Sequence, residues 1–210
     1  RQVIDTTGGA YYAKLLEAKG ITYLGSFHNG FRQLTNSKHP VTKPEDLKDL
    51  KIRVPGSAVY MGVFNALGAS PTAMSWSEVF TAIQQKTIDG QENGCSVTKS
   101  AKMDEIQQYM TIWNYSYEND LFVANSRVWE SLDENTRQLL QECATESCEW
   151  GRDHLEAEED QLIQGFMDSG MQVDILTEDQ LQAFKDAVAG VTADLKTEYG
   201  EDACAAFGIN

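Results

Sequence analysis

Residues 51–93 have the sequence KIRVPGSAVYMGVFNALGASPTAMSWSEVFTAIQQKTIDGQEN and predict a strand, two helices and a polar segment, in that order. In residues 51–55, Ile52 and Val54 alternate with charged side chains. This alternation is typical of a strand with one apolar face, so we expect Arg53 on the opposite face.

Two amphipathic helices are predicted to follow this strand. The first begins after Ser57, a natural N-cap, and ends at Gly68, which suits the C′ position. The second begins with a capping box formed by Ser75 and Glu78. Apolar side chains recur at helical spacing in both: Tyr60, Val63, Phe64 and Leu67 in the first, and Trp76, Val79, Phe80 and Ile83 in the second.

The polar segment DGQEN, residues 89–93, follows the second helix. Five consecutive turn-forming or hydrogen-bonding residues beyond a helix are usually a solvated turn. The residue pattern alone therefore favours an exposed turn here.

Further strands and helices are predicted to alternate along the rest of the chain, which favours an α/β fold. A helix is expected to begin after Asp133 and to reach Asp168, and the pattern from Thr177 to Gln180 predicts a second capping box. The other predicted helices are residues 10–19, a short helix that begins at Pro44, and residues 103–110. The other predicted strands are residues 21–27, 111–113, 121–124 and 173–176. Residues 201–210 are expected at the surface.

Composition excludes several classes of partner. The 210 residues carry a formal net charge of −15, so the chain lacks the basic stripe that nucleic acid or an anionic membrane requires. No apolar run approaches the ~20 residues that span a bilayer, and no signal segment opens the chain, so an exported protein would have had its signal peptide removed. The four cysteines have no metal-binding spacing, and we expect mostly buried free thiols.

Enzyme classes find little support in the sequence. A cysteine hydrolase would use Cys95 with His28, His39 or His154 as the base, yet no pattern pairs them. Calcium-loop, P-loop and dinucleotide-binding patterns are missing from the sequence, as is the H-E-x-x-H zinc motif. We therefore expect no catalytic residue, metal or cofactor. A protein that acts only through interactions of its helical second half is a further alternative.

Four segments together resemble the solute-binding proteins of TRAP transporters, the DctP family. They are GFRQLTNS at residues 30–37, PEDLKDLKIRVP at 44–55, LGASPTAMSWSEV at 67–79 and DGQEN at 89–93. Their order and spacing match the family pattern. In two places the chain departs from it: Asp49 stands where glycine is common, and Gly94 replaces a frequent proline.

The resemblance implies a two-lobed periplasmic-binding-protein-like α/β fold with a long helix bridging the lobes. Residues 1–34 and 119–158 would form lobe I, lacking its N-terminal portion, and residues 35–118 and 159–210 would form lobe II. The chain would pass between the lobes near Thr35 and Leu121, which are the hinge candidates.

The resemblance also implies a substrate site. Arg53 matches the family's principal carboxylate-binding arginine, and a guanidinium suits this role because it offers two parallel N–H donors. Arg32 matches an arginine that lines the ligand cleft, and Asn93 matches a residue that hydrogen-bonds the same carboxylate. Trp76 matches a pocket wall, and Gln91 and Glu92 are further candidates. From the residues alone, the alternatives are a surface Arg32, an Arg53 paired with Asp46 or Asp49, and core packing of Trp76.

The function implied is capture of a small organic acid in the periplasm and its delivery to the small and large integral membrane subunits of a TRAP transporter. The acid would be a sugar acid such as a uronate, or a C4-dicarboxylate. The chain would not insert into the membrane.

Overall fold

The structure, a computed structural model, describes residues 2–209. Arg1, the first residue of predicted lobe I, and Asn210, the last residue of predicted lobe II, lie outside this range. The helices are α1 Gly9–Glu17, α2 Ala58–Ala66, α3 Trp76–Gln84, α4 Cys95–Ser100, α5 Ser126–Ser131, α6 Glu134–Asp168, α7 Glu178–Ala187 and α8 Ala189–Ala206. The strands are β1 Ile21–Asn36, β2 Ile52–Val54, β3 Thr72–Ala73, β4 Gly90–Gly94, β5 Tyr109–Asn125 and β6 Gln172–Ile175. Single helical turns occur at Ile4–Gly8, Pro44–Leu47 and Met103–Glu105.

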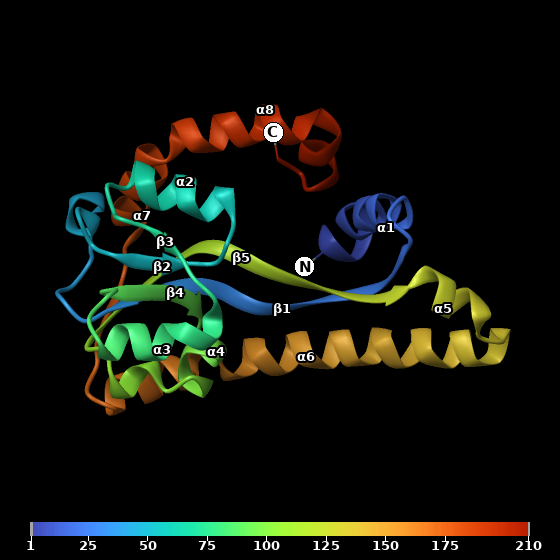
Figure 1. The fold of residues 1–210 in the computed structure, drawn as a ribbon, viewed down its shortest axis with the longest axis horizontal. Coiled ribbons are helices and arrows are strands. Elements are labelled where there is room, and N and C mark those ends of the chain that lie inside the picture. Colours follow the sequence, from blue (N-terminus) through green and yellow to red (C-terminus); the bar gives the residue numbers. More distant parts are fainter. Residues whose placement is uncertain (1, 210) are drawn as a thin grey trace. The chain divides into compact units, whose positions relative to one another are not determined.

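The strands form a mixed sheet in the order β3-β2-β4-β1-β5-β6. β2 runs parallel to β3 and β4, β4 runs antiparallel to β1, and β5 runs parallel to β6. Figure 1 shows α2 and α3 on opposite sides of β2 and β4. Because helices cover both faces, the three residues of β2 and the five of β4 are all buried.

The chain divides into two compact units. Of the described residues, 2–29, 118–157 and 196–209 form unit 1, and 30–117 and 158–195 form unit 2. The chain passes from one unit to the other within β1, near the middle of β5, within α6 and within α8. Unit 2 contains a large apolar core, built around Phe64, Leu34 and Trp113, on the α2 face of the sheet.

The sequence predicted most of unit 2 correctly. The strand with Ile52 and Val54, both helices after it and their apolar stripes are confirmed. Asp133 caps α6, with its Oδ1 accepting a hydrogen bond from the Thr136 N–H at 3.0 Å. The capping box of Thr177 and Gln180 begins α7 as predicted.

The exposed turn predicted for residues 89–93 is wrong. Residues Gly90–Gly94 form the buried strand β4, between β1 on one side and β2 on the other. Two partner strands pair with its backbone, Glu92 accepts hydrogen bonds from Arg32 and Tyr115, and Gln91 Nε2 donates to Thr35, so burial is possible without apolar residues. Gln91 Oε1 alone of these side-chain groups is buried without a partner among residues 2–209.

The predictions for residues 103–124 are also partly wrong. Met103 begins one 3-10 turn and Met110 belongs to a strand, so no helix covers both, whereas α4 was not predicted. Lys102, which lies between α4 and this turn, has a left-handed backbone with φ of 56°. This conformation prevents α4 from continuing into the turn. The two predicted short strands are one 17-residue strand, β5, whose Phe122 and Val123 are exposed rather than buried.

Other local differences concern helix ends and the C-terminal segment. Ser75 occupies the N-cap of α3 without a side-chain cap bond, and its Oγ lies 3.1 Å from the Oγ of Ser77, so the capping box is not formed. Residues 201–206 are helical beyond a kink at Gly200, whose φ is 81°, and Ala203 is buried, which contradicts a wholly exposed tail. The four cysteines are free, but Cys143 is exposed, so the thiols are less buried than expected.

Candidate functional site

Arg32 and Glu92 form a buried ion pair on the α2 face of the sheet. The β1–β4 register places Leu34 opposite Glu92 and Arg32 opposite Gly94, so the two side chains are diagonal neighbours. Arg32 Nε donates to Glu92 Oε2 at 2.5 Å and Nη2 donates to Oε1 at 3.0 Å. Arg32 is 3% exposed and Glu92 is 0% exposed, so Arg32 is not the surface arginine of the alternative interpretation.

Two tyrosines complete this pair. The Tyr115 hydroxyl donates to Glu92 Oε2 at 2.5 Å, and the Arg32 guanidinium lies over the Tyr60 ring at 5.2 Å. Burial raises the pKa of Tyr115 well above its usual value, and the charge of Glu92 raises it further, so this hydroxyl stays a donor. Tyr115 was not predicted from the sequence to belong to this cluster. The alternation of Trp113, Tyr115 and Tyr117 was the signal that could have found it.

Arg53 has a different environment. Its Nε and Nη2 donate to the carbonyl oxygen of Met74, at 2.9 and 2.7 Å, and its guanidinium lies 5.4 Å from the centre of the Trp76 ring. Arg53 is 5% exposed, and within residues 2–209 it bonds no carboxylate and its Nη1 has no hydrogen-bond partner. The alternative pairing with Asp46 is wrong, because Asp46 instead accepts hydrogen bonds from backbone N–H groups of the preceding loop.

Burial dominates the electrostatics of Arg53. Desolvation lowers the pKa of its guanidinium, the charge of Glu92 raises it, and the charge of Arg32 lowers it. A guanidinium remains protonated at neutral pH even so. Arg53 is therefore a buried cation with a neutral acceptor, whereas Arg32 has an anion beside it.

The two arginines lie on opposite faces of the sheet. Arg53 pairs with Gln91 across β2 and β4, and Glu92 is the next residue of β4, so its side chain points the other way. The structure thus brings together Arg32 with Glu92, and Arg53 with Trp76. Arg32 and Arg53 interact through charge, with Glu92 acting on Arg53 as well.

Gln91 and Asn93 lie on the Arg53 face of β4. Gln91 Nε2 donates to Thr35 Oγ1 at 2.8 Å and is fully buried, so it ties β4 to β1. Asn93 Oδ1 accepts a hydrogen bond from the Gly94 N–H at 3.1 Å. Trp76 is partly buried and packs against the core of α3, so core packing and contact with Arg53 both apply to it.

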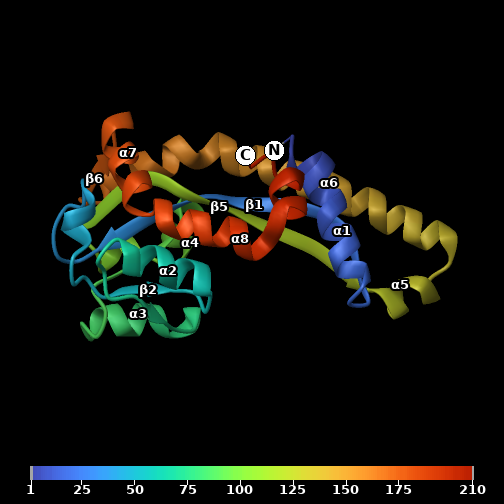
Figure 2. The same ribbon diagram turned by 90° about the horizontal axis from the view of Figure 1, so that it is seen from above.

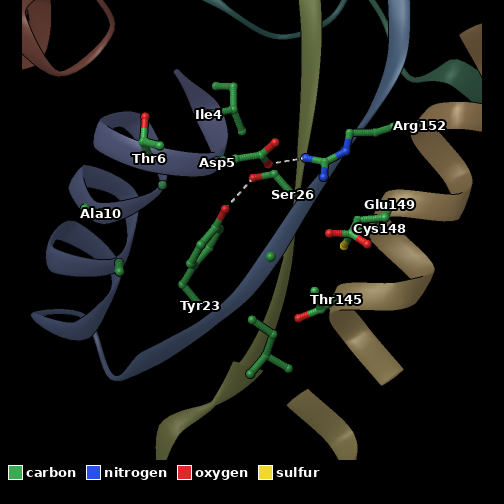
Figure 3. A pocket seen from close by; sticks show the side chains of 14 residues that line it. Ile4, Asp5, Thr6, Ala10, Tyr23, Ser26, Thr145, Cys148, Glu149 and Arg152 are labelled. Atoms are coloured by element: carbon green, nitrogen blue, oxygen red, sulfur yellow. Dashed lines mark hydrogen bonds and ion pairs between the residues drawn. The ribbon is translucent and has the colours of Figure 1, made fainter. Parts of the chain in front are cut away.

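Unit 1 contains a separate cavity of about 490 Å³ that holds none of the predicted site residues. Figure 3 shows Arg152 extending from α6 towards Asp5, with which it forms an ion pair. The Tyr23 hydroxyl lies 2.8 Å from Ser26 Oγ in the same cavity.

Cys95 does not have the environment of a nucleophile. Burial, followed by the charge of Glu159, raises the pKa of its thiol to about 12. The thiolate is the reactive form, and at neutral pH this thiol stays protonated. Within residues 2–209, no group of three His, Cys, Asp or Glu side chains could hold a metal ion, and no helix is long and apolar enough to cross a membrane.

The fold and the site define an α/β protein whose central sheet carries two buried arginines in different electrostatic settings. The sequence model of one protein family, the bacterial extracellular solute-binding proteins of family 7 (DctP), matches residues 1–198. The chain belongs to this family.

Curated relatives and solved structures are consistent with membership of this family. The chain is 34% identical over 180 residues to the 2,3-diketo-L-gulonate-binding periplasmic protein of Escherichia coli, covering 86% of this chain and 54% of the relative. It is 31% identical over 206 residues to the C4-dicarboxylate-binding periplasmic protein of Rhodobacter capsulatus, covering 98% and 62%. The sugar acid binding protein of Advenella mimigardefordensis, solved with galactonate, superposes with a TM-score of 0.93 at 29% identity, covering 99% of this chain and 67% of that one.

These comparisons confirm the predicted family and its two-lobed binding-protein class of fold. The family is one of solute-binding proteins rather than of enzymes. Both curated relatives are named periplasmic proteins and the family is extracellular, so the chain is a periplasmic protein. The chain spans between 54% and 62% of the length of these two relatives.

Proposed function

We propose that this chain captures a small organic acid for a TRAP transporter, with Arg53 as the group that binds the acid's carboxylate. The observation that supports the proposal is the burial of Arg53 together with its lack of a carboxylate partner. It is buried, it bonds a neutral carbonyl through Nε and Nη2, and its Nη1 has no hydrogen-bond partner among residues 2–209.

The balance of charge favours a single carboxylate at this place. Glu92 offsets the charge of Arg32 through two hydrogen bonds, so the three buried groups together retain one positive charge, on Arg53. A buried cation without an anion is costly, and a ligand carboxylate would remove that cost. Charge-assisted bonds to a guanidinium are among the stronger hydrogen bonds in proteins.

The other candidate residues have distinct proposed roles. Trp76 forms a wall beside the Arg53 guanidinium, and Asn93 offers its amide from the same face of the sheet. Arg32, Glu92 and Gln91 hold the strands and set the charge of the site, and Arg32 has further donors that could reach a ligand.

The ligand class is proposed from relatives. The names of the related proteins refer to a diketogulonate, a galactonate and C4-dicarboxylates, all of which carry a carboxylate. We therefore propose a sugar acid, such as an aldonate or uronate, or a C4-dicarboxylate. Delivery to the small and large integral membrane subunits, closure of two lobes near Thr35 and Leu121, and the predicted lobe boundaries are parts of the same proposal.

Titration calorimetry of the full-length protein against C4-dicarboxylates, hexuronates and aldonates tests this function. One class is expected to bind, and Arg53→Ala is expected to weaken it at least ~100-fold, because losing one partner of a buried charge pair costs several kcal/mol. Arg53→Lys should retain part of the affinity, since it keeps the charge but not the fork of donors. The matched control is Arg127→Ala, which removes an exposed arginine and should change nothing.

Two outcomes would contradict the proposal. Unchanged affinity in Arg53→Ala would remove Arg53 from the site. No binding by any acid would favour a protein that acts through interactions with other macromolecules, for which no small ligand raises the melting temperature.

A further inference from the structure

Helix α3 begins at the edge of the sheet where Arg53 lies. β2 runs parallel to both β3 and β4, and ligands of open α/β sheets bind outside the carboxyl ends of such strands. The Met74 N–H donates to the Val54 carbonyl oxygen at 3.4 Å, so the residue before the N-cap of α3 lies at the carboxyl end of β2. Figure 2 shows α2 and α3 on either side of β2, and α3 covers the face that carries Arg53.

The first turn of α3 has backbone N–H groups without acceptors. Trp76 and Ser77 are the first two residues of the helix, and no described residue accepts a hydrogen bond from their N–H groups. Ser75 has the N-cap position, but its Oγ lies 3.1 Å from Ser77 Oγ and caps no N–H. At α7, by contrast, the Thr177 side chain accepts a hydrogen bond from the Gln180 N–H. The start of α3 is therefore open to an acceptor from outside the chain.

Arg53 places a further unpaired donor beside this helix start. Its Nε and Nη2 bond the carbonyl oxygen of Met74, two residues before α3, and its guanidinium lies 5.4 Å from the centre of the Trp76 ring. Arg53 is only 5% exposed, yet its Nη1, which bonds no atom among residues 2–209, keeps accessible surface. The side chain is thus held in place by the protein and still offers one reachable donor, and a preorganised donor loses little entropy on binding.

The electrostatics of this helix start favour an anion. The unbonded N–H groups of a helix N-terminus act as roughly half a positive charge, and Arg53 adds a full one. Glu78 is the acid in the first turn of α3, but its side chain is exposed to water and its N–H donates to the Ser75 carbonyl oxygen at 3.1 Å. A carboxylate has two acceptor oxygens, so it can bond the guanidinium and the helix N–H groups together.

We infer that the start of α3 is the second half of the carboxylate site: the N–H groups of Trp76 and Ser77 bind one oxygen of the carboxylate, and Arg53 Nη1 binds the other. The identity of the natural ligand rests on the proposed function, whereas the binding of a carboxylate at this place is tested without it. The site takes the free acid anion and rejects the amide or ester of the same acid, which lacks a second anionic oxygen.

Nuclear magnetic resonance of the full-length protein tests this site with acetate as the probe, because acetate is a carboxylate with almost nothing attached. Acetate is expected to shift the backbone amide signals of Trp76 and Ser77 and the Nε signal of Arg53. The three shifts should saturate together, with one dissociation constant. Acetamide, which has nearly the same shape but no charge, should move none of them at the same concentrations.

Substitutions in the first turn separate the backbone donors from the side chains. Ser77→Pro removes one N–H where proline costs no helical hydrogen bond, and should weaken acetate binding roughly tenfold or more relative to Ser77→Ala, which keeps that N–H. The matched control is Asp179→Pro, at the second position of α7, which should leave acetate binding unchanged. Glu78→Gln removes an anion from the turn and should strengthen binding about two- to fivefold, a gain that damage to the helix would not produce.

The outcomes distinguish this inference from the proposed function. If acetate moves the Arg53 signal but neither helix amide, or if Ser77→Pro binds acetate as Ser77→Ala does, Arg53 acts alone: the inference is overturned and the proposed function stands. If acetate moves all three signals while no organic acid binds in calorimetry, the proposed function is contradicted and the inference stands. The absence of any shift at Arg53, Trp76 and Ser77 would overturn both.

Discussion

Arg32 and Arg53 point to opposite faces of one sheet, and Glu92, which bonds Arg32 directly, follows immediately after the residue that pairs with Arg53. Because side chains alternate between the two faces along β4, Glu92 neutralises the charge of Arg32 and does not bond Arg53. The glutamate belongs to the Arg32 face, which leaves Arg53 with a neutral carbonyl as its hydrogen-bond partner among residues 2–209.

Removal of the Glu92 charge should destabilise the fold. Glu92→Gln should destabilise the fold by about 3–5 kcal/mol, because it leaves the buried Arg32 without its anion. Urea denaturation measures the change. Combining it with Arg32→Met should recover part of the loss, since the two residues form one unit.

The control for that prediction is an exposed pair. Glu105 lies 3.1 Å from Lys102, and both side chains are more than half exposed. Glu105→Gln should change stability by less than about 1 kcal/mol, as exposed pairs do. A comparable loss in both variants would show that the Arg32–Glu92 pair has no special weight.

Tyr115 predicts how stability changes at alkaline pH. Its folded-state pKa is raised above that of the unfolded chain, so folding retains a proton that the unfolded chain releases. Its contribution to stability is complete below about pH 10, the unfolded pKa, and is lost as the pH rises towards the folded value.

Phenolate absorbance during a pH titration checks this behaviour. The chain has eight tyrosines, and one late-ionising phenol should disappear in Tyr115→Phe. Tyr199→Phe, which removes an exposed ring, is the matched control and should leave the late phase in place. An unchanged late phase in Tyr115→Phe would contradict the assignment. Tyr12, whose pKa burial also raises, should ionise later than the exposed phenols.

Asp49 offers a stabilising substitution. Its φ of 63° lies in the left-handed region that glycine adopts most readily, and glycine is what the family pattern has at this position. Asp49→Gly should raise the free energy of unfolding by about 0.5–1 kcal/mol. The neighbouring Lys48, with φ of −53°, is the control, and Lys48→Gly should lower it. A loss of stability in Asp49→Gly would mean that its side chain matters more than its backbone.

Gly90 should tolerate no side chain. A Cβ there would collide with the carbonyl oxygen of Thr35 and lie 2.9 Å from Asn36 Cβ, in the middle of the β2-β4-β1 pairing. Gly90→Ala is expected to cost ~3 kcal/mol, at the high end for overpacking. Gly56→Ala has no atom within 4 Å of the added carbon and should be close to neutral in the same thermal scans. Equal melting temperatures for the two variants would contradict the predicted crowding.

The sequence predicted elements whose signals are local. The stripes of α2 and α3 and the caps of α6 and α7 depend on neighbours within a few residues, so pattern and structure agree. β4 lacked such a signal, because Gln91 and Glu92 are polar and only their partners on β1 make burial possible. Composition cannot show partners that lie some 60 positions away along the chain.

The candidate site residues could likewise be predicted only where a local signal or the family pattern pointed to them. The family pattern gave Arg53 and Arg32, but their placement on opposite faces follows from the register of β4, which no local pattern contains. Tyr115 was missed because strand β5 was divided into two short pieces, which left the aromatic alternation between them without a strand. Trp113 was predicted to lie in a strand. Its unsatisfied indole N–H could not be predicted, because it results from the packing of the surrounding rings.

The exposed thiol of Cys143 makes the chain ready for distance spectroscopy. Cys143 belongs to unit 1, whereas Cys95 and Cys148 are buried and Cys204 is partly covered, so a maleimide dye should react first at one position. A second thiol in place of the exposed Lys86 would place a dye on unit 2. Energy transfer between the two dyes would then report, molecule by molecule, whether an organic acid changes the separation of the units.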